Sequence, residues 1–173
     1  MGRSTSKTET IVALDLATKC GWAVLEGRKR VDSGRETLRR GKEHRGARWA
    51  NFDAFLSELV ATYNPEVLAF ERVRRHVGTS AAHVYGGLLA GIERFEHKRL
   101  RDDVHGSLFH PEIVPIEIST WRKAACGRGD IIKEEVVKWA KRRFRYLPHT
   151  DDEAEALAIA EAIRKIRSGE YTT

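Results

Sequence analysis

Near its N-terminus the chain reads Ile11-Val-Ala-Leu-Asp15-Leu-Ala-Thr-Lys-Cys-Gly21-Trp-Ala-Val24. The apolar run that ends at Asp15 predicts a buried strand over 10–16, and a second strand is predicted over 21–25. A third is predicted over 31–38, after a connection of only five residues. Because such short connections join antiparallel neighbours, we expect the chain to open with a three-stranded antiparallel meander.

Helical and strand patterns alternate after this meander. Apolar residues recur at spacings of three and four over 45–63 and 80–98, which predicts amphipathic helices. Apolar runs over 66–73 and 112–118 predict two further strands, and the first of them again ends near a carboxylate, Glu71. The helix over 80–98 carries three glycines, which favour close packing against another helix.

The C-terminal third of the chain is predicted to be helical after a polar, turn-rich loop over 99–111. Ser119 is expected to cap a short helix, and Asp130 a longer one that runs to about Tyr146. A last helix is predicted from Thr150 or Asp151 to about residue 167. This element order is that of the RNase H-like fold: an α/β protein with a mixed five-stranded sheet, three antiparallel strands followed by two parallel ones, flanked by helices.

Length and composition are typical of one globular domain. The chain has 173 residues, of which 41% are hydrophobic and 32% charged; we expect one domain over 10–168, with tails at 1–9 and 169–173. The longest apolar runs have four or five residues, whereas a membrane span needs about 20, so we expect no membrane segment and a cytoplasmic protein. Cys20 and Cys126 lack metal-binding spacing, which favours a reducing compartment without structural zinc.

Basic charge is concentrated in two stretches. The chain has 31 Lys and Arg against 25 Asp and Glu, a net charge of +6. The stretch 28–48 alone holds nine basic and three acidic residues, which is also +6, and a second basic run lies at 138–145. Such side chains can bind DNA phosphates without reading sequence, and we expect Arg39 and Arg40 to do so. The alternative is a solvated basic face.

Acidic side chains are predicted to converge from three segments. Asp15 and Glu71 follow two strands that can be neighbours, while Asp152 and Glu155 lie three residues apart on one face of the last helix. Carboxylates so placed repel each other unless a cation lies between them. Hard oxygen donors of this kind suit Mg²⁺ or Mn²⁺ rather than zinc, and two such ions promote in-line phosphodiester hydrolysis. The alternative is that these acids only cap a helix or face solvent.

Four motifs in this order resemble the RuvC family of Holliday-junction resolvases. They are the stretch 11–24 quoted above, Phe70-Glu71-Arg72-Val73, Cys126-Gly-Arg-Gly-Asp-Ile-Ile-Lys133, and Asp152-Glu-Ala-Glu155-Ala-Leu-Ala-Ile-Ala160. The resemblance covers about 10–166. It implies a homodimer that acts in DNA recombination and repair, cutting two strands of like polarity at a four-way junction with two Mg²⁺ ions per site, which Mn²⁺ can replace.

The resemblance also assigns roles to the acids. Asp15 matches the first-strand metal ligand, Glu71 the second-strand acid, and Asp152 and Glu155 the pair on the last helix. All four are thereby implied as catalytic metal ligands. The family usually has Asp where Glu155 stands, and Asp151, on nearly the same helix face, is an alternative to Asp152.

Basic residues are assigned in the same way. Arg122 and Lys133 match the two residues that approach the scissile phosphate, and Lys133 is thus implied in catalysis. Where many members have an aromatic residue that stacks on an unpaired base, this chain has Arg74, followed by Arg75. Because arginine can stack on bases and pair with phosphates, we expect both to contact DNA. The departure weakens the expectation of a strict cut-site sequence.

Several other functions remain alternatives. A nuclease of the same fold could act on forks, flaps or structured RNA, and a non-catalytic relative could bind nucleic acid without cutting it. An actin-like ATPase or sugar kinase needs two lobes and a phosphate-binding loop, which this chain lacks, so we expect no nucleotide cofactor. The helix over 80–98 is the candidate dimer element; ordinary packing on the sheet is the alternative.

Overall fold

Five strands form one mixed sheet in the computed structural model, which describes residues 8–74, 78–103 and 110–172. The strands are β1 (Thr10–Asp15), β2 (Lys19–Glu26), β3 (Lys29–Thr37), β4 (Val67–Arg72) and β5 (Glu112–Glu117). Their order across the sheet is β3-β2-β1-β4-β5. β1, β2 and β3 pair antiparallel, while β4 pairs parallel with both β1 and β5. The predicted mixed sheet is confirmed.

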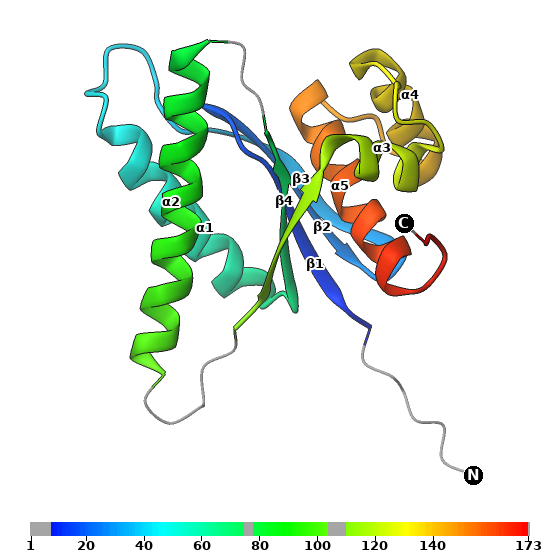
Figure 1. Ribbon diagram of the computed structural model, residues 1–173, viewed down its shortest axis with the longest axis horizontal. Helices are drawn as coiled ribbons and strands as arrows, with labels where there is room; N and C mark the ends of the chain where they lie inside the picture. Colours follow the sequence, from blue (N-terminus) through cyan, green and yellow to red (C-terminus); the bar gives the residue numbers. More distant parts are fainter. Residues whose placement is uncertain (1–7, 75–77, 104–109, 173) are drawn as a thin grey trace.

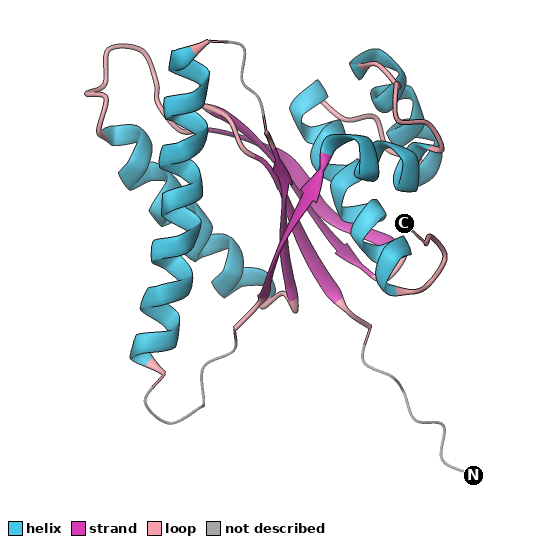
Figure 2. Cartoon of the chain, in the orientation of Figure 1, coloured by secondary structure: helices cyan, strands magenta, loops and turns pink. Residues whose placement is uncertain are grey.

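Helices cover both faces of this sheet (Figures 1 and 2). They are α1 (Ala47–Tyr63), α2 (Thr79–Asp102), α3 (Ile118–Cys126), α4 (Lys133–Phe144) and α5 (Asp151–Arg167). α1 and α2 lie on one face, and α3, α4 and α5 lie on the other. No helix in the described part of the chain is long and apolar enough to cross a membrane.

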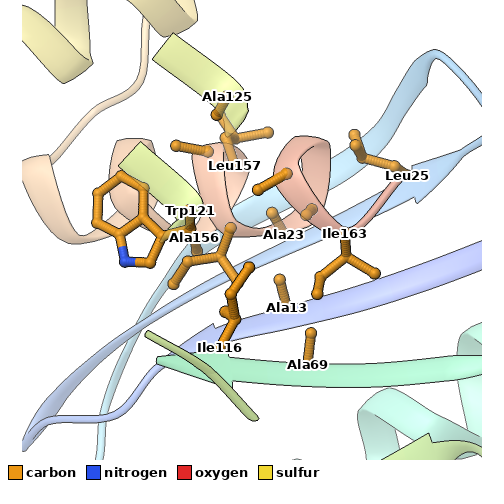
Figure 3. Packing of buried hydrophobic residues seen from close by; sticks show 14 of the residues in the cluster. Ala13, Ala23, Leu25, Ala69, Ile116, Trp121, Ala125, Ala156, Leu157 and Ile163 are labelled. Atoms are coloured by element: carbon orange, nitrogen blue, oxygen red, sulfur yellow. The ribbon is translucent and has the colours of Figure 1, made fainter. Parts of the chain in front are cut away.

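Strand alternation divides the core into two layers. β1 directs Ile11 and Ala13 toward the face covered by α5, and Val12 and Leu14 toward the face covered by α1 and α2. This alternation follows from the period of two in a strand. On the α5 side the central strands carry small residues, which lets α5 lie close to the sheet (Figure 3).

α2 packs tightly against α1, as its glycines predict. A Cβ atom on Gly87 would lie 2.4 Å from the Trp49 ring, and one on Gly91 would lie 2.8 Å from the Phe52 ring. A Cβ on Gly86 would meet nothing within 4 Å. Two of the three glycines therefore permit the helix contact, and the third faces open space.

The prediction of a loop over 99–111 is wrong at its start, because α2 continues through Asp102. Arg99 and Arg101 lie in its last turn, where cations interact favourably with the helix dipole. These residues also have good helix propensity, which the polar composition of the segment conceals. Residues 104–109 of the predicted loop lie outside the described residues.

The two predicted helix caps at 119 and 130 are also wrong. β5 leads directly into α3, so the N-cap is Glu117 and Ser119 lies inside the helix. Asp130 instead accepts a 3.1 Å hydrogen bond from Arg128, and α4 starts at Lys133. Glu135, the third residue of α4, accepts a hydrogen bond from the backbone N–H of the N-cap residue Ile132. This contact replaces the expected cap.

Both cysteines are free thiols. Cys20 is buried in β2, and Cys126 is half-buried at the end of α3. Burial raises the pKa of the Cys126 thiol to about 12. Neither thiol is therefore suited to act as a thiolate nucleophile near neutral pH.

Candidate active site

The ends of β1 and β4 place two acids at one edge of the sheet. The two strands are parallel neighbours, and Leu14 pairs with Phe70. The next residues thus lie side by side, with Asp15 at the end of β1 and Glu71 one residue before the end of β4. Both side chains are partly buried.

The first two turns of α5 bring the other two acids to the same edge. The helix is capped by Thr150, whose hydroxyl accepts a 3.1 Å hydrogen bond from the backbone N–H of Glu153. Gly21, which pairs with Asp15 across β1 and β2, makes the approach possible. A Cβ atom there would lie 2.0 Å from the backbone oxygen of Asp152. The glycine in the first motif therefore determines how closely α5 can approach the strand ends.

Asp15 lies at the centre of the acidic group. Burial raises its pKa well above the usual value, and the negative charges of Glu155, Glu71 and Asp152 raise it further. The Lys133 ammonium opposes this increase. The parallel pairing of β1 and β4 and the close approach of Asp152 to Gly21 place these residues in one site. The four acids concentrate negative charge around the Asp15 carboxylate, and such a concentration favours a bound cation.

Glu71 is held by a residue that the sequence patterns do not single out for the site. The indole N–H of Trp121, on α3, donates a 2.8 Å hydrogen bond to Oε2 of Glu71. Burial raises the pKa of Glu71, and this hydrogen bond opposes the increase. Trp121 is fully buried, so a core role is what composition predicts. The sequence offers one chemical indication of the contact with Glu71, because the N–H of a buried indole usually needs an acceptor.

Glu155 is held between two cations. Nη2 of Arg122 lies 3.4 Å from its Oε1, and Nζ of Lys133 lies 3.1 Å from its Oε2. Lys133 also reaches Asp151, at 3.3 Å. Although partial burial opposes it, these carboxylates raise the pKa of Lys133 above its usual value. The two basic residues assigned to the phosphate thus lie beside the acids.

Asp152, rather than Asp151, faces the acidic group. Burial and the neighbouring Asp151 raise its pKa, while Lys133, Arg35 and other cations oppose them. Nη1 of Arg35 lies 3.7 Å from its Oδ2. Asp151 is exposed, and its pKa is lowered because Lys133 and backbone hydrogen bonds together outweigh the effect of burial. Arg35 belongs to the basic stretch 28–48, but its place in the site was not predicted.

The donor set suits a hard divalent cation, although its geometry is not closed around one. Among residues 8–74, 78–103 and 110–172, no three His, Cys, Asp or Glu side chains are arranged to hold a single metal ion. The donors are nevertheless all carboxylates, which Mg²⁺ and Mn²⁺ prefer. Burial raises the pKa of Asp15, the charges of Glu155, Glu71 and Asp152 raise it further, and Lys133 opposes them. The residues therefore fit such an ion, provided that Glu155 separates from its two cations.

The remaining residues assigned to DNA lie outside the acidic group. Nε of Arg74 donates a 2.8 Å hydrogen bond to Glu117 at the end of β5. Arg39 and Arg40 make local contacts with Glu43 in the segment between β3 and α1. Arg40 and Arg74 are exposed and Arg39 is partly exposed, and the hydrogen bonds described for the three go to Glu43 and Glu117 rather than to the four acids. Arg75 lies outside the described residues.

Comparison with known proteins identifies the fold. No protein-family model and no curated protein sequence matches the chain. Thermus thermophilus RuvC has a TM-score of 0.73 and 19% identity, over 92% of this chain and 96% of that one. The same protein in complex with Holliday junction substrate has a TM-score of 0.73 and 20% identity, over 93% and 96%. The yeast mitochondrial Holliday junction resolvase has a TM-score of 0.67 and 15% identity, over 93% and 81%. The predicted RuvC-like fold is thereby confirmed.

Proposed function

We propose that this protein is a RuvC-like resolvase, a metal-dependent and structure-selective DNA endonuclease that cuts four-way (Holliday) junctions. The observation that carries the proposal is the meeting of Asp15, Glu71, Asp152 and Glu155 at one sheet edge. Structural neighbours with the same fold include a RuvC bound to a Holliday junction substrate. The reaction would be hydrolysis of a phosphodiester bond, the chemistry for which clustered carboxylates are suited.

The four carboxylates would hold Mg²⁺, two ions per site, with Mn²⁺ able to replace it. When bound, the ions would supply an activated water and stabilise the leaving 3′ oxygen. Asp15 is the central ligand in this proposal, because its buried charge interacts with each of the other three acids. Asp152 is preferred to Asp151, which is exposed and already paired with Lys133.

Lys133 and Arg122 would bind the scissile phosphate. In the described structure both are engaged by Glu155, at 3.1 and 3.4 Å. A phosphate bound nearby would offer each of them a second anion, and both would be free to bind it if Glu155 served as a metal ligand instead of pairing with them. Charge-assisted contacts of this type are about twice as strong as neutral hydrogen bonds.

Paired symmetric nicks need two active sites, so we propose a homodimer. The inner side of α2 is occupied by α1, whereas the side that carries Gly86 is open. This open side is the candidate dimer surface. The basic stretch 28–48 and the exposed lysines and arginines of α4 would then bind the arms of the junction through their phosphates.

The test compares cleavage of four-way, fork, flap and plain duplex DNA, and of a four-way RNA, with Mg²⁺ or with chelator. Asp15→Asn should abolish cleavage while junction binding persists. Asp53→Asn is the control, because Asp53 is an exposed acid on α1, paired with Arg94. Cleavage in chelator, or by the Asp15→Asn protein, would contradict the metal mechanism. Cleavage of RNA alone would contradict the junction assignment.

Activity on a wider range of branched DNA is a second candidate. Arg74 stands where many family members stack an aromatic ring, and its guanidinium lies on Glu117 at 2.8 Å. A flexible cation selects a base less strictly than a fixed ring does. Comparable rates on forks, flaps and four-way junctions would support this broader activity.

A further inference from the structure

Two consecutive residues of α3 connect the acids of β4 and α5. Trp121 donates its indole N–H to Oε2 of Glu71, at 2.8 Å. Its neighbour Arg122 places Nη2 3.4 Å from Oε1 of Glu155. One short helix thus contacts two proposed metal ligands that come from different layers of the fold.

Trp121 also supports the arginine beside it. The Arg122 guanidinium lies 5.2 Å from the centre of the Trp121 ring, within the range of a cation–π contact. Nε of Arg122 is buried and has no hydrogen-bond partner among the described residues. Hydrogen bonds alone therefore do not fix the position of the Arg122 guanidinium, and the contact with the Trp121 ring helps to hold it.

The indole itself has little freedom to move. Trp121 is fully buried and belongs to the core between α5 and the sheet (Figure 3). Side chains in such close-packed surroundings keep one rotamer. The N–H donor is consequently held in one place by the core, and it can restrain the more exposed Glu71 carboxylate.

We infer that Trp121 is a positioning residue of the metal site, an inference that rests on the proposed function. By binding Oε2 it orients the Glu71 carboxylate and leaves Oε1, which accepts no hydrogen bond from the described residues, for the cation. Through Arg122 it also sets where Glu155 lies relative to Glu71. Partners that orient metal ligands in this way commonly contribute 10–100-fold in metal affinity.

A role in packing alone predicts a different result. Replacing a buried tryptophan by a smaller ring leaves a cavity and lowers stability, wherever in the core it lies. Trp139 on α4 provides the matched comparison. It packs against the same core cluster and makes an edge contact with Phe144, with ring centres 5.9 Å apart, but it touches none of the four acids.

The experiment measures Mn²⁺ binding by titration calorimetry on the full chain without DNA, for wild type, Trp121→Phe, Trp139→Phe and Asp15→Asn. We expect the Kd for Mn²⁺ to rise about 10-fold in Trp121→Phe and to stay at the wild-type value in Trp139→Phe. Thermal unfolding should show a larger loss of stability in Trp121→Phe than in Trp139→Phe, because Trp121 is fully buried and Trp139 only partly. An unchanged Kd in Trp121→Phe, or an equal rise in both variants, would overturn the inference.

A second variant separates the hydrogen bond from the shape of the ring. Benzothienylalanine, introduced at position 121 by codon suppression, replaces the indole N–H by sulfur at nearly constant size, so the core should stay filled even if Trp121→Phe does not fold. The same rise in Kd is expected, and a wild-type Kd would overturn the inference. If Asp15→Asn abolishes binding while both variants at 121 bind normally, only the positioning role fails. If wild-type protein binds no Mn²⁺, the proposed metal function fails and this inference fails with it.

Discussion

Replacing the central carboxylate should make the metal-free protein more stable while it abolishes cleavage. Asp15 is partly buried and faces the charges of Glu155, Glu71 and Asp152, with Lys133 as partial compensation. Asparagine has the same shape without the charge. A buried polar group left uncompensated costs about 1–3 kcal/mol, and more when it is charged, so this range is the least effect expected here. Active sites often keep such destabilising groups because function needs them.

This cost determines how stability depends on pH. The pKa of Asp15 is higher in the folded protein than the usual value of 3.8. Below that value the carboxyl is protonated in both the folded and the unfolded state, so wild type and Asp15→Asn should be equally stable. As pH rises through the raised folded pKa, ionisation increasingly favours the unfolded wild type, and the advantage of Asp15→Asn reaches its full size.

Thermal unfolding in chelator at neutral pH measures the effect. For a chain of this length 1 kcal/mol corresponds to about 2–4 °C, so the Tm of Asp15→Asn should exceed that of wild type by about 2–12 °C. Adding Mg²⁺ should raise the wild-type Tm and leave that of the variant unchanged. The control Asp53→Asn removes an exposed ion pair, worth about 0–1 kcal/mol. A variant that melts at or below the wild-type temperature would show that Asp15 carries no electrostatic strain.

Three other substitutions test separate parts of the site and its surroundings. Lys133→Ala should lower kcat for junction cleavage by about 10²–10³-fold with little change in KM, because the Lys133 ammonium stabilises charge that develops in the transition state. A change in KM alone would assign Lys133 to DNA binding and not to catalysis. Gly21→Ala should lower the free energy of unfolding by about 1–3 kcal/mol in urea titrations, because the new Cβ would lie 2.0 Å from a backbone oxygen in the first turn of α5. Gly86→Ala, where the space is open, should not lower it, and equal effects would contradict this account of α5 packing. Combined replacement of Arg39 and Arg40 by Ala should reduce the slope of log affinity against log salt by about 2 in junction-binding titrations with chelator, and an unchanged slope would remove them from the DNA surface.

Strand and helix patterns were well determined by local sequence. The apolar run before Asp15 and the spacing of Phe52, Leu56 and Leu59 each reflect one periodicity, and both elements form where it predicts. The errors lie at element ends, where a single contact outweighs the pattern. Asp130 has a capping side chain, yet Arg128 binds it, and the helix begins three residues later.

Patterns along the chain establish which residue types the site contains and the order in which they occur. Asp15, Glu71 and the acids of α5 follow apolar runs, and such runs reveal strands and helices because burial has a period that can be read along the chain. The glycine at 21 likewise belongs to a motif that the sequence shows directly.

How these side chains are held depends on the packing of the folded chain. Trp121 meets Glu71 across 50 positions, and Arg122 meets Glu155 across 33. Such contacts depend on how α3 and α5 pack on the sheet, and side-chain hydrogen bonds leave no periodic trace in a sequence. A buried tryptophan therefore appears in the pattern as core alone, whereas its N–H partner is a property of the folded chain.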